Sequence, residues 1–66
     1  MDYAKKIRVE LLERDVRQFE LARAVGVNEF TLSRRLRDGI TQKTYEQYRA
    51  LIDEIAESKK GGGHES

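Results

Sequence analysis

Apolar residues recur at helical spacing in four segments of the chain, and no segment alternates in the manner of a strand. In residues 3–14, Tyr3, Ile7 and Leu11 form one stripe, and Asp2 precedes them as a candidate N-cap. Val9 and Leu12 fall outside this stripe, where they either widen the core face or leave a small exposed patch for a partner. The pattern predicts an amphipathic first helix.

The last apolar stripe predicts a long helix that follows Thr41 as N-cap and ends at about Ser58. Arg49 and Asp53, four residues apart, are expected to form a surface ion pair within it. Three consecutive glycines from residue 61 should end the helix, so we expect a folded domain over residues 1–60 and a disordered tail over 61–66. The core side of this helix is formed by Tyr45, Tyr48, Leu51, Ile52, Ile55 and Ala56.

Two shorter helices are predicted between these long ones. The second helix spans residues 17 or 18 to 24 and stops at Gly26, and the third follows Asn28 as N-cap and ends near Arg37. Gly39 can then take the positive φ that ends the third helix. The sequence thus predicts a compact all-α domain of four helices.

The second and third helices carry the pattern of a helix-turn-helix. Two helices that cross closely need a small residue where they meet, and Ala22 supplies it. The turn at residues 25–27 holds Gly26 between two valines, while Leu32 and Leu36 are expected inside. This spacing is typical of DNA-binding helix-turn-helix proteins.

Composition excludes several kinds of chemistry. The 66 residues suffice for one domain, contain no cysteine and hold a single histidine, His64, in the predicted tail. A thiolate site, a histidine metal cluster and a packed Ser-His-Asp triad are therefore excluded, and no acid, base and nucleophile converge. No apolar run could span a bilayer and no signal peptide is evident, so we expect a cytoplasmic protein with no cofactor and no enzymatic activity.

Charge is unevenly distributed along the chain. The net charge is +1 overall, whereas residues 17–43 alone carry six basic and three acidic side chains. A basic middle on a nearly neutral protein favours a face that binds phosphate, although a solvated helix surface would give the same count.

Residues 7–39 resemble the Xre/Cro-like helix-turn-helix family of phage repressors and related bacterial regulators. The resemblance rests on Gln18, Leu21-Ala22, Val25-Gly26-Val27, Asn28 and the run Thr31-Leu32-Ser33-Arg34. It implies a lambda-repressor-like fold and a phosphate contact from Gln18, for which helix capping is the alternative.

The chain also departs from this family at three points. Arg17 stands where Ser or Thr usually precedes the glutamine, and Asp15, a candidate N-cap or left-handed turn residue, stands where the family usually has glycine. A fifth helix, which the family often has, is absent from the prediction.

Helical geometry alone also indicates which side chains of the third helix are exposed. At about 100° per residue, Leu32 and Leu36 share one side, and Phe30, Arg34 and Arg37 fall between about 140° and 200° away. An exposed aromatic between two arginines suits a helix in the major groove, where arginine binds guanine and an aromatic edge contacts a thymine methyl. The alternative is that Phe30 fills a gap beside Tyr45 or Ile40 and the arginines are solvated.

The remaining candidate DNA contacts flank this face. Thr31 and Ser33 suit bases or phosphates, and Arg35 and Lys43 suit phosphates. Asn28 lies at a helix N-terminus that attracts phosphate, although capping alone would explain it. Glu29 could accept from cytosine, although a first-turn carboxylate is favourable by itself. The complete set of predicted DNA-binding residues is Gln18, Asn28, Glu29, Phe30, Thr31, Ser33, Arg34, Arg35, Arg37 and Lys43.

Two functions follow from these observations. The first is a transcription regulator of the phage or mobile-element Cro/repressor type, which binds double-stranded DNA at a palindromic operator and is nucleoid-associated when bound. One such module buries little DNA surface, so a weak homodimer formed on DNA is expected. The second is a helical protein-interaction module, such as an antirepressor, that uses the last helix or Val9 and Leu12.

Overall fold

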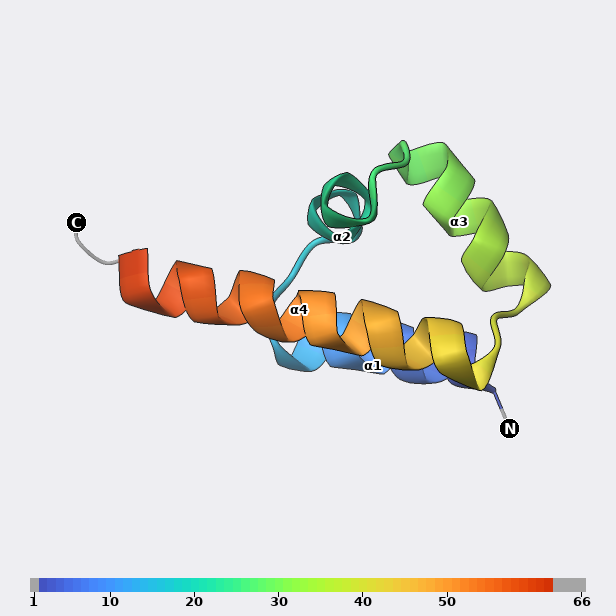
Figure 1. Cartoon of the computed structure of the whole chain (residues 1–66), viewed down its shortest axis with the longest axis horizontal. Helices are drawn as coiled ribbons and strands as arrows, with labels where there is room; N and C mark the ends of the chain where they lie inside the picture. Colours follow the sequence, from blue (N-terminus) through green and yellow to red (C-terminus); the bar gives the residue numbers. More distant parts are fainter. Residues whose placement is uncertain (1, 63–66) are drawn as a thin grey trace.

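The computed structural model describes residues 2–62, with side chains for residues 2–59. Over this range the chain forms four helices and no strand: α1 (Tyr3–Glu13), α2 (Gln18–Val25), α3 (Glu29–Asp38) and α4 (Gln42–Gly62). α1 and α4 lie side by side and run in the same direction, and α2 and α3 lie on one side of this pair (Figure 1). The prediction of a compact all-α domain of four helices is confirmed.

Three helices begin at the predicted caps. The side-chain oxygens of Asp2, Asn28 and Thr41 accept hydrogen bonds from the backbone N–H three residues later, at 3.0, 2.7 and 3.2 Å. Each cap satisfies a donor that has no partner inside the helix, a contribution of about 0.5–2 kcal/mol. The starts of α1, α3 and α4 are therefore set by local sequence.

α2 begins differently. Asp15 has a φ of 55°, so it serves as the left-handed turn residue, and Arg17 occupies the N-cap position instead. Glu20 Oε1 accepts a hydrogen bond from the Arg17 backbone N–H at 2.8 Å. The first turn of α2 is thus satisfied from inside the helix.

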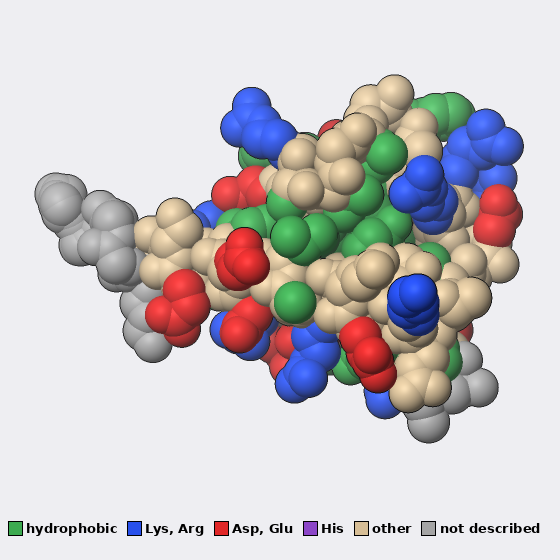
Figure 2. All heavy atoms as spheres, in the orientation of Figure 1, with side chains coloured by type: hydrophobic (Ala, Val, Ile, Leu, Met, Phe, Trp, Pro, Cys, Tyr) green, Lys and Arg blue, Asp and Glu red, His purple; other side chains and the backbone are tan. Residues whose placement is uncertain are grey.

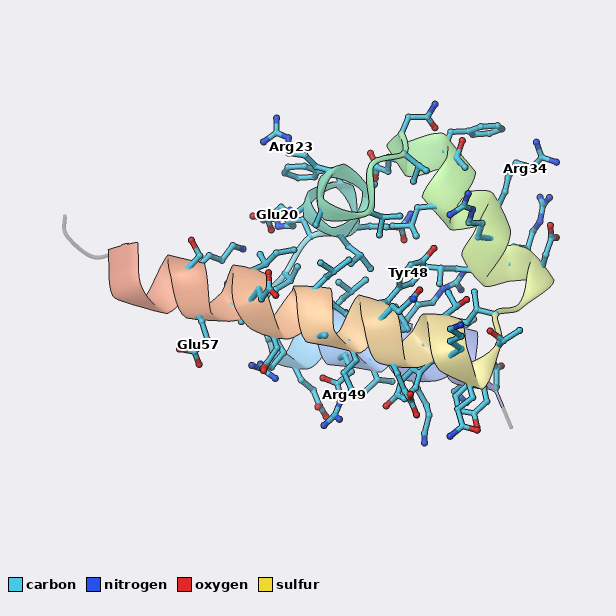
Figure 3. The ribbon with its side chains drawn as sticks, viewed as in Figure 1. Glu20, Arg23, Arg34, Tyr48, Arg49 and Glu57 are labelled. Atoms are coloured by element: carbon cyan, nitrogen blue, oxygen red, sulfur yellow. The ribbon has the colours of Figure 1, made fainter. Side chains whose placement is uncertain are left out.

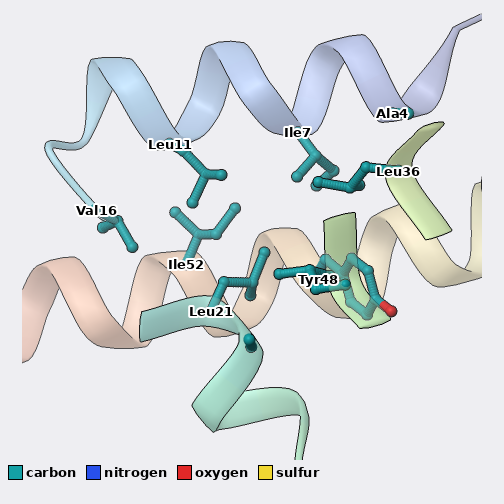
Figure 4. Close-up of a cluster of buried hydrophobic side chains, with 10 residues drawn as sticks. Ala4, Ile7, Leu11, Val16, Leu21, Leu36, Tyr48 and Ile52 are labelled. Atoms are coloured by element: carbon teal, nitrogen blue, oxygen red, sulfur yellow. The ribbon is translucent and has the colours of Figure 1, made fainter. Parts of the chain in front are cut away.

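The core is a single apolar cluster to which every helix contributes. Ile7, Leu21, Leu32 and Ile52 are completely buried, one from each helix. In Figure 4, Leu11 of α1 and Ile52 of α4 point toward each other. The remaining buried members are Ala4, Leu11, Val16, Ala22, Leu36 and Tyr48.

Tyrosines and turn valines complete this cluster. Tyr48 is buried as expected, whereas Tyr45 is half-buried and stacks against Tyr3 with ring centroids 5.1 Å apart. Val25 and Val27 flank the α2–α3 turn and pack against the cluster. These contacts attach the turn to the core.

Two predictions about α4 differ from the structure. The helix continues past Ser58 to Gly62, because extending an existing helix adds a hydrogen bond per residue; residues 63–66 of the expected tail lie outside the described residues. The predicted Arg49–Asp53 pair is wrong. Arg49 lies 3.5 Å from Glu10, and Asp53 pairs with Arg14, because the adjacent α1 supplies closer partners.

Candidate nucleic-acid interface

A tight turn connects α2 to α3. The backbone N–H groups of Gly26 and Val27 both donate to the Ala22 carbonyl, at 2.9 and 3.0 Å. Gly26 has a φ of 96°, a left-handed conformation that glycine adopts without strain. Ala22 is 2% exposed and belongs to the apolar core cluster. The turn thereby sets the direction in which α3 leaves α2.

The outer face of α3 consists of Phe30, Arg34 and Arg37. Leu32 and Leu36 are buried on the opposite side, which fixes the rotation of the helix. Phe30 is 71% exposed, so it fills no gap beside Tyr45 or Ile40, and that part of the alternative is wrong; the arginines are exposed, as both interpretations expect. Arg34 points away from the rest of the domain (Figure 3). The predicted exposed face is therefore present.

Smaller polar residues border this face. Thr31 and Ser33 are half-buried, and Asn28 and Glu29 are exposed at the start of α3. The Asn28 side-chain oxygen is used by the cap, which leaves its amide group to donate to a ligand. Backbone N–H groups at a helix start also attract anions. The start of α3 can therefore both cap itself and receive a phosphate.

Arg35 lies on the side of α3 that faces α4. Its Nη1 donates to the hydroxyl of Tyr48 at 3.3 Å, and both residues line a hollow of about 350 Å³ next to Gly39 and Thr44. Lys43 is exposed in the first turn of α4. Arg35 is therefore held against the domain, whereas Arg34 extends from it.

Gln18 opens α2 and is half-buried. Glu20 satisfies the Arg17 N–H of this turn, and within residues 2–59 the Gln18 side chain makes no hydrogen bond. The capping role considered for Gln18 is thus performed by Glu20. Its amide can still reach a ligand at the helix N-terminus.

The electrostatics differ between α3 and the long helices. Among the described residues Arg34 has no ion pair, and Arg37 has only its neighbour Asp38, at 3.7 Å. In Figure 2, Lys and Arg side chains lie on both sides of α3, and carboxylates and cations alternate along α4. Of the three α3 arginines, Arg34 is thus the one without a partner among the described residues, and it is available to an anionic ligand.

Three carboxylates outside α3, those of Glu10, Glu20 and Asp53, form ion pairs with cations of other elements. The Lys59 ammonium lies 2.8 Å from Glu20 and, together with the Arg17 backbone N–H, lowers the pKa of that carboxyl. A hydrogen bond to Asp53 raises the pKa of the Arg14 guanidinium. These charged groups bind one another across elements and belong to the scaffold.

Several exposed side chains were not among the predicted DNA-binding residues. Lys5 and Arg8 are exposed on the flank of α1 that adjoins α3, and Phe19 is exposed on α2. A helical wheel of the first helix would have placed Arg8 about 100° and Lys5 about 160° from Ile7. That signal separates them from the core, but it does not show which neighbouring helix they adjoin.

Within residues 2–62, no helix has the length and apolar content needed to cross a membrane. The described residues also contain no group of three or more His, Cys, Asp or Glu side chains arranged to hold a metal ion. Comparisons of the chain with protein-family models, curated proteins and solved structures found no match. The resemblance inferred from the sequence motif therefore stays a prediction.

Proposed function

We propose that this chain is a sequence-specific DNA-binding protein, a transcription regulator of the phage or mobile-element Cro/repressor type. In this proposal α2 and α3 form a helix-turn-helix, and α3 enters the major groove of an operator. The observation that carries the proposal is the outer face of α3. There Phe30, 71% exposed, lies beside Arg34 and Arg37, directly opposite the buried Leu32 and Leu36.

The chemistry of this face matches base edges in the major groove. A guanidinium binds guanine O6 and N7 through two parallel hydrogen bonds, so Arg34 would select guanine. The Phe30 ring would contact the methyl group of thymine, which only this base presents. A phenyl ring that is 71% exposed adds little to the core, so a ligand contact would give it a role.

Phosphate contacts would orient the helix in the groove. Gln18, Asn28, Arg35, Arg37 and Lys43 lie at helix ends or on the borders of α3, where the backbones of a bound duplex pass. Thr31 and Ser33 would contact bases or phosphates, and Glu29 would accept a hydrogen bond from cytosine N4. Such contacts supply affinity, and the bases contacted by Arg34 and Phe30 supply specificity.

One domain of this size covers a single half-site. Two copies on a palindromic operator, with half-sites about one helical turn apart, would place two α3 helices in successive major grooves. A weak homodimer completed on the DNA is consistent with this requirement. The protein would then act in the cytoplasm, associated with the nucleoid when bound.

The proposal is tested by selecting duplexes from a random pool with the purified protein. A titration should then show tighter binding to the selected duplex than to a scrambled one in the presence of an anionic competitor. Equal affinity for both sequences would contradict the proposal.

A second candidate function is a helical protein-interaction module, such as an antirepressor. It is favoured by two exposed apolar side chains on α1, Val9 at 43% and Leu12 at 82%. The same titration separates the two functions, because an interaction module of this kind has no affinity for DNA that survives the competitor.

A further inference from the structure

The two flanks of α1 carry their charges differently. On the flank toward α4, Glu10 and Arg14 form ion pairs with Arg49 and Asp53. On the flank toward α3, the Arg8 side chain is exposed and forms no ion pair within residues 2–59. One side of this helix is therefore neutralised within the fold, and the other side is not.

Two hollows on the second flank meet at Arg8. The larger, about 590 Å³, lies between α1 and the end of α3 and is lined by the cations Lys5, Arg8 and Arg37. Both carboxylates of this hollow already have partners. Asp2 caps α1, and Asp38 pairs with Arg37. The surface therefore holds basic groups from two helices.

The smaller hollow extends the same surface to the start of α2. It measures about 290 Å³ and is lined by Arg8, Leu12, Arg17 and Gln18 without any carboxylate. Lys5, Arg8, Arg17 and Arg37, here called the α1 strip, thus run from the end of α3 across α1 to the start of α2.

The shape of the α1 strip matches an extended polyanion. Duplex DNA carries about one charge per 1.7 Å of axis, and a helix in the major groove has a phosphate backbone along each side. Arg35 lies on the α4 side of α3, whereas the strip begins at Arg37 on its α1 side. An acidic protein segment could also use Leu12, but such a contact would not account for cations that continue as far as α3.

We infer that the α1 strip binds the second phosphate backbone of the duplex, with Arg8 as its central phosphate contact. This inference rests on the proposed function and adds α1 to the interface. It assigns Lys5 and Arg8 of α1 a ligand of one chemical class, the phosphodiester backbone of double-stranded DNA.

The test measures the salt dependence of binding to the selected and scrambled duplexes for the parent protein and three variants. Arg8→Gln should reduce the slope of log affinity against log salt by about 0.9, the value for one lost phosphate contact. Affinity should fall by the same factor on both duplexes, because a phosphate contact carries no sequence information. Arg8→Lys, which retains the charge, should keep the parental slope.

Arg49→Gln is the matched control, since it also removes one positive charge, but from a residue of α4 that is paired with Glu10 of α1. Its slope should equal that of the parent. A parental slope for Arg8→Gln would overturn the inference and leave the hollow beside Leu12 to a protein partner. A parent protein without preference for the selected duplex would instead contradict the proposed function.

Discussion

Arginines occur in two regions of this domain in different surroundings: the contact between α1 and α4, and the outer face of α3. In the first, Arg14 and Arg49 each bind a carboxylate of the opposite helix. In the second, Arg34 meets no carboxylate among the described residues, and Phe30 is 71% exposed. The partner that folding brings near, rather than the residue type, decides whether an arginine is paired within the scaffold or left exposed.

The energetic weights of the two regions also differ. Exposed ion pairs contribute about 0.2–1 kcal/mol each, so the contact between α1 and α4 depends mainly on apolar burial. Burying one side chain such as Ile7 or Ile52 contributes about 1.5–3 kcal/mol. The outer face of α3 contributes almost nothing to folding, so substitutions there should separate binding from stability.

The largest effect is expected at Ala22, a buried residue of α2. Ala22→Leu should abolish cooperative melting at room temperature, because overpacking at a 2% exposed site costs about 1–3 kcal/mol or more in a marginally stable domain. Circular dichroism against temperature provides the measurement. Ala24→Leu, at an exposed position of the same helix, is the control and should melt like the parent. A parental curve for Ala22→Leu would show that α2 and α3 do not pack closely at this residue.

The next effect compares two arginines of equal charge on α3. Arg34→Ala should weaken binding to the selected duplex by about 1–3 kcal/mol, with a smaller loss on scrambled DNA, because a base contact is lost. Arg35→Ala should weaken both duplexes about evenly and reduce the salt slope by about one ion. Titrations at several salt concentrations measure both effects. Equal losses on both duplexes for Arg34→Ala would reduce this residue to a phosphate contact.

Phe30→Ala should separate binding from stability. At 71% exposure the ring supports little of the core, so the free energy of unfolding should change by no more than about 0.5 kcal/mol. Binding should lose its preference for thymine at one position of the selected duplex. Chemical denaturation and a titration against duplexes with uracil in place of thymine, which lack the methyl group, measure the two effects. A loss of about 3 kcal/mol in stability would instead place the ring in the core.

The smallest effect concerns Glu20 on the scaffold side. Its pKa is lowered in the folded state by Lys59 and by the Arg17 N–H, so its contribution to stability is complete above the ordinary glutamate pKa of about 4.3. That contribution is lost as the pH falls through the lower folded pKa. Because the pair is partly exposed, the loss should stay below about 1 kcal/mol. Denaturation of Glu20→Gln between pH 7 and 3 should show a weaker pH dependence than the parent, and an equal dependence would assign the acid sensitivity to other carboxyls.

Local rules predicted much of this fold. The caps at Asp2, Asn28 and Thr41 and the left-handed Gly26 depend on a few neighbouring residues, so the sequence was sufficient for them. The exposed position of Phe30 followed from helical periodicity alone. These features need no knowledge of how the helices pack.

Tertiary contacts were harder to predict. The i, i+4 rule paired Arg49 with Asp53, but the parallel neighbour α1 supplies Glu10 and Arg14 instead. Val16 lies in a turn without periodicity, so no pattern indicated its burial. The role proposed for Arg8 likewise depends on which helices adjoin α1. The spacing of residues within one helix carries no information about its neighbours.

Methylation interference tests most directly whether the outer face of α3 binds base edges. Methylating guanine N7 in the selected duplex blocks the major-groove acceptor to which arginine donates. We expect such methylation to prevent binding of the parent and of Arg35→Ala at a defined guanine, and Arg34→Ala to be insensitive at that guanine. An unchanged interference pattern for Arg34→Ala, or a parent protein indifferent to methylation at every guanine, would contradict this expectation.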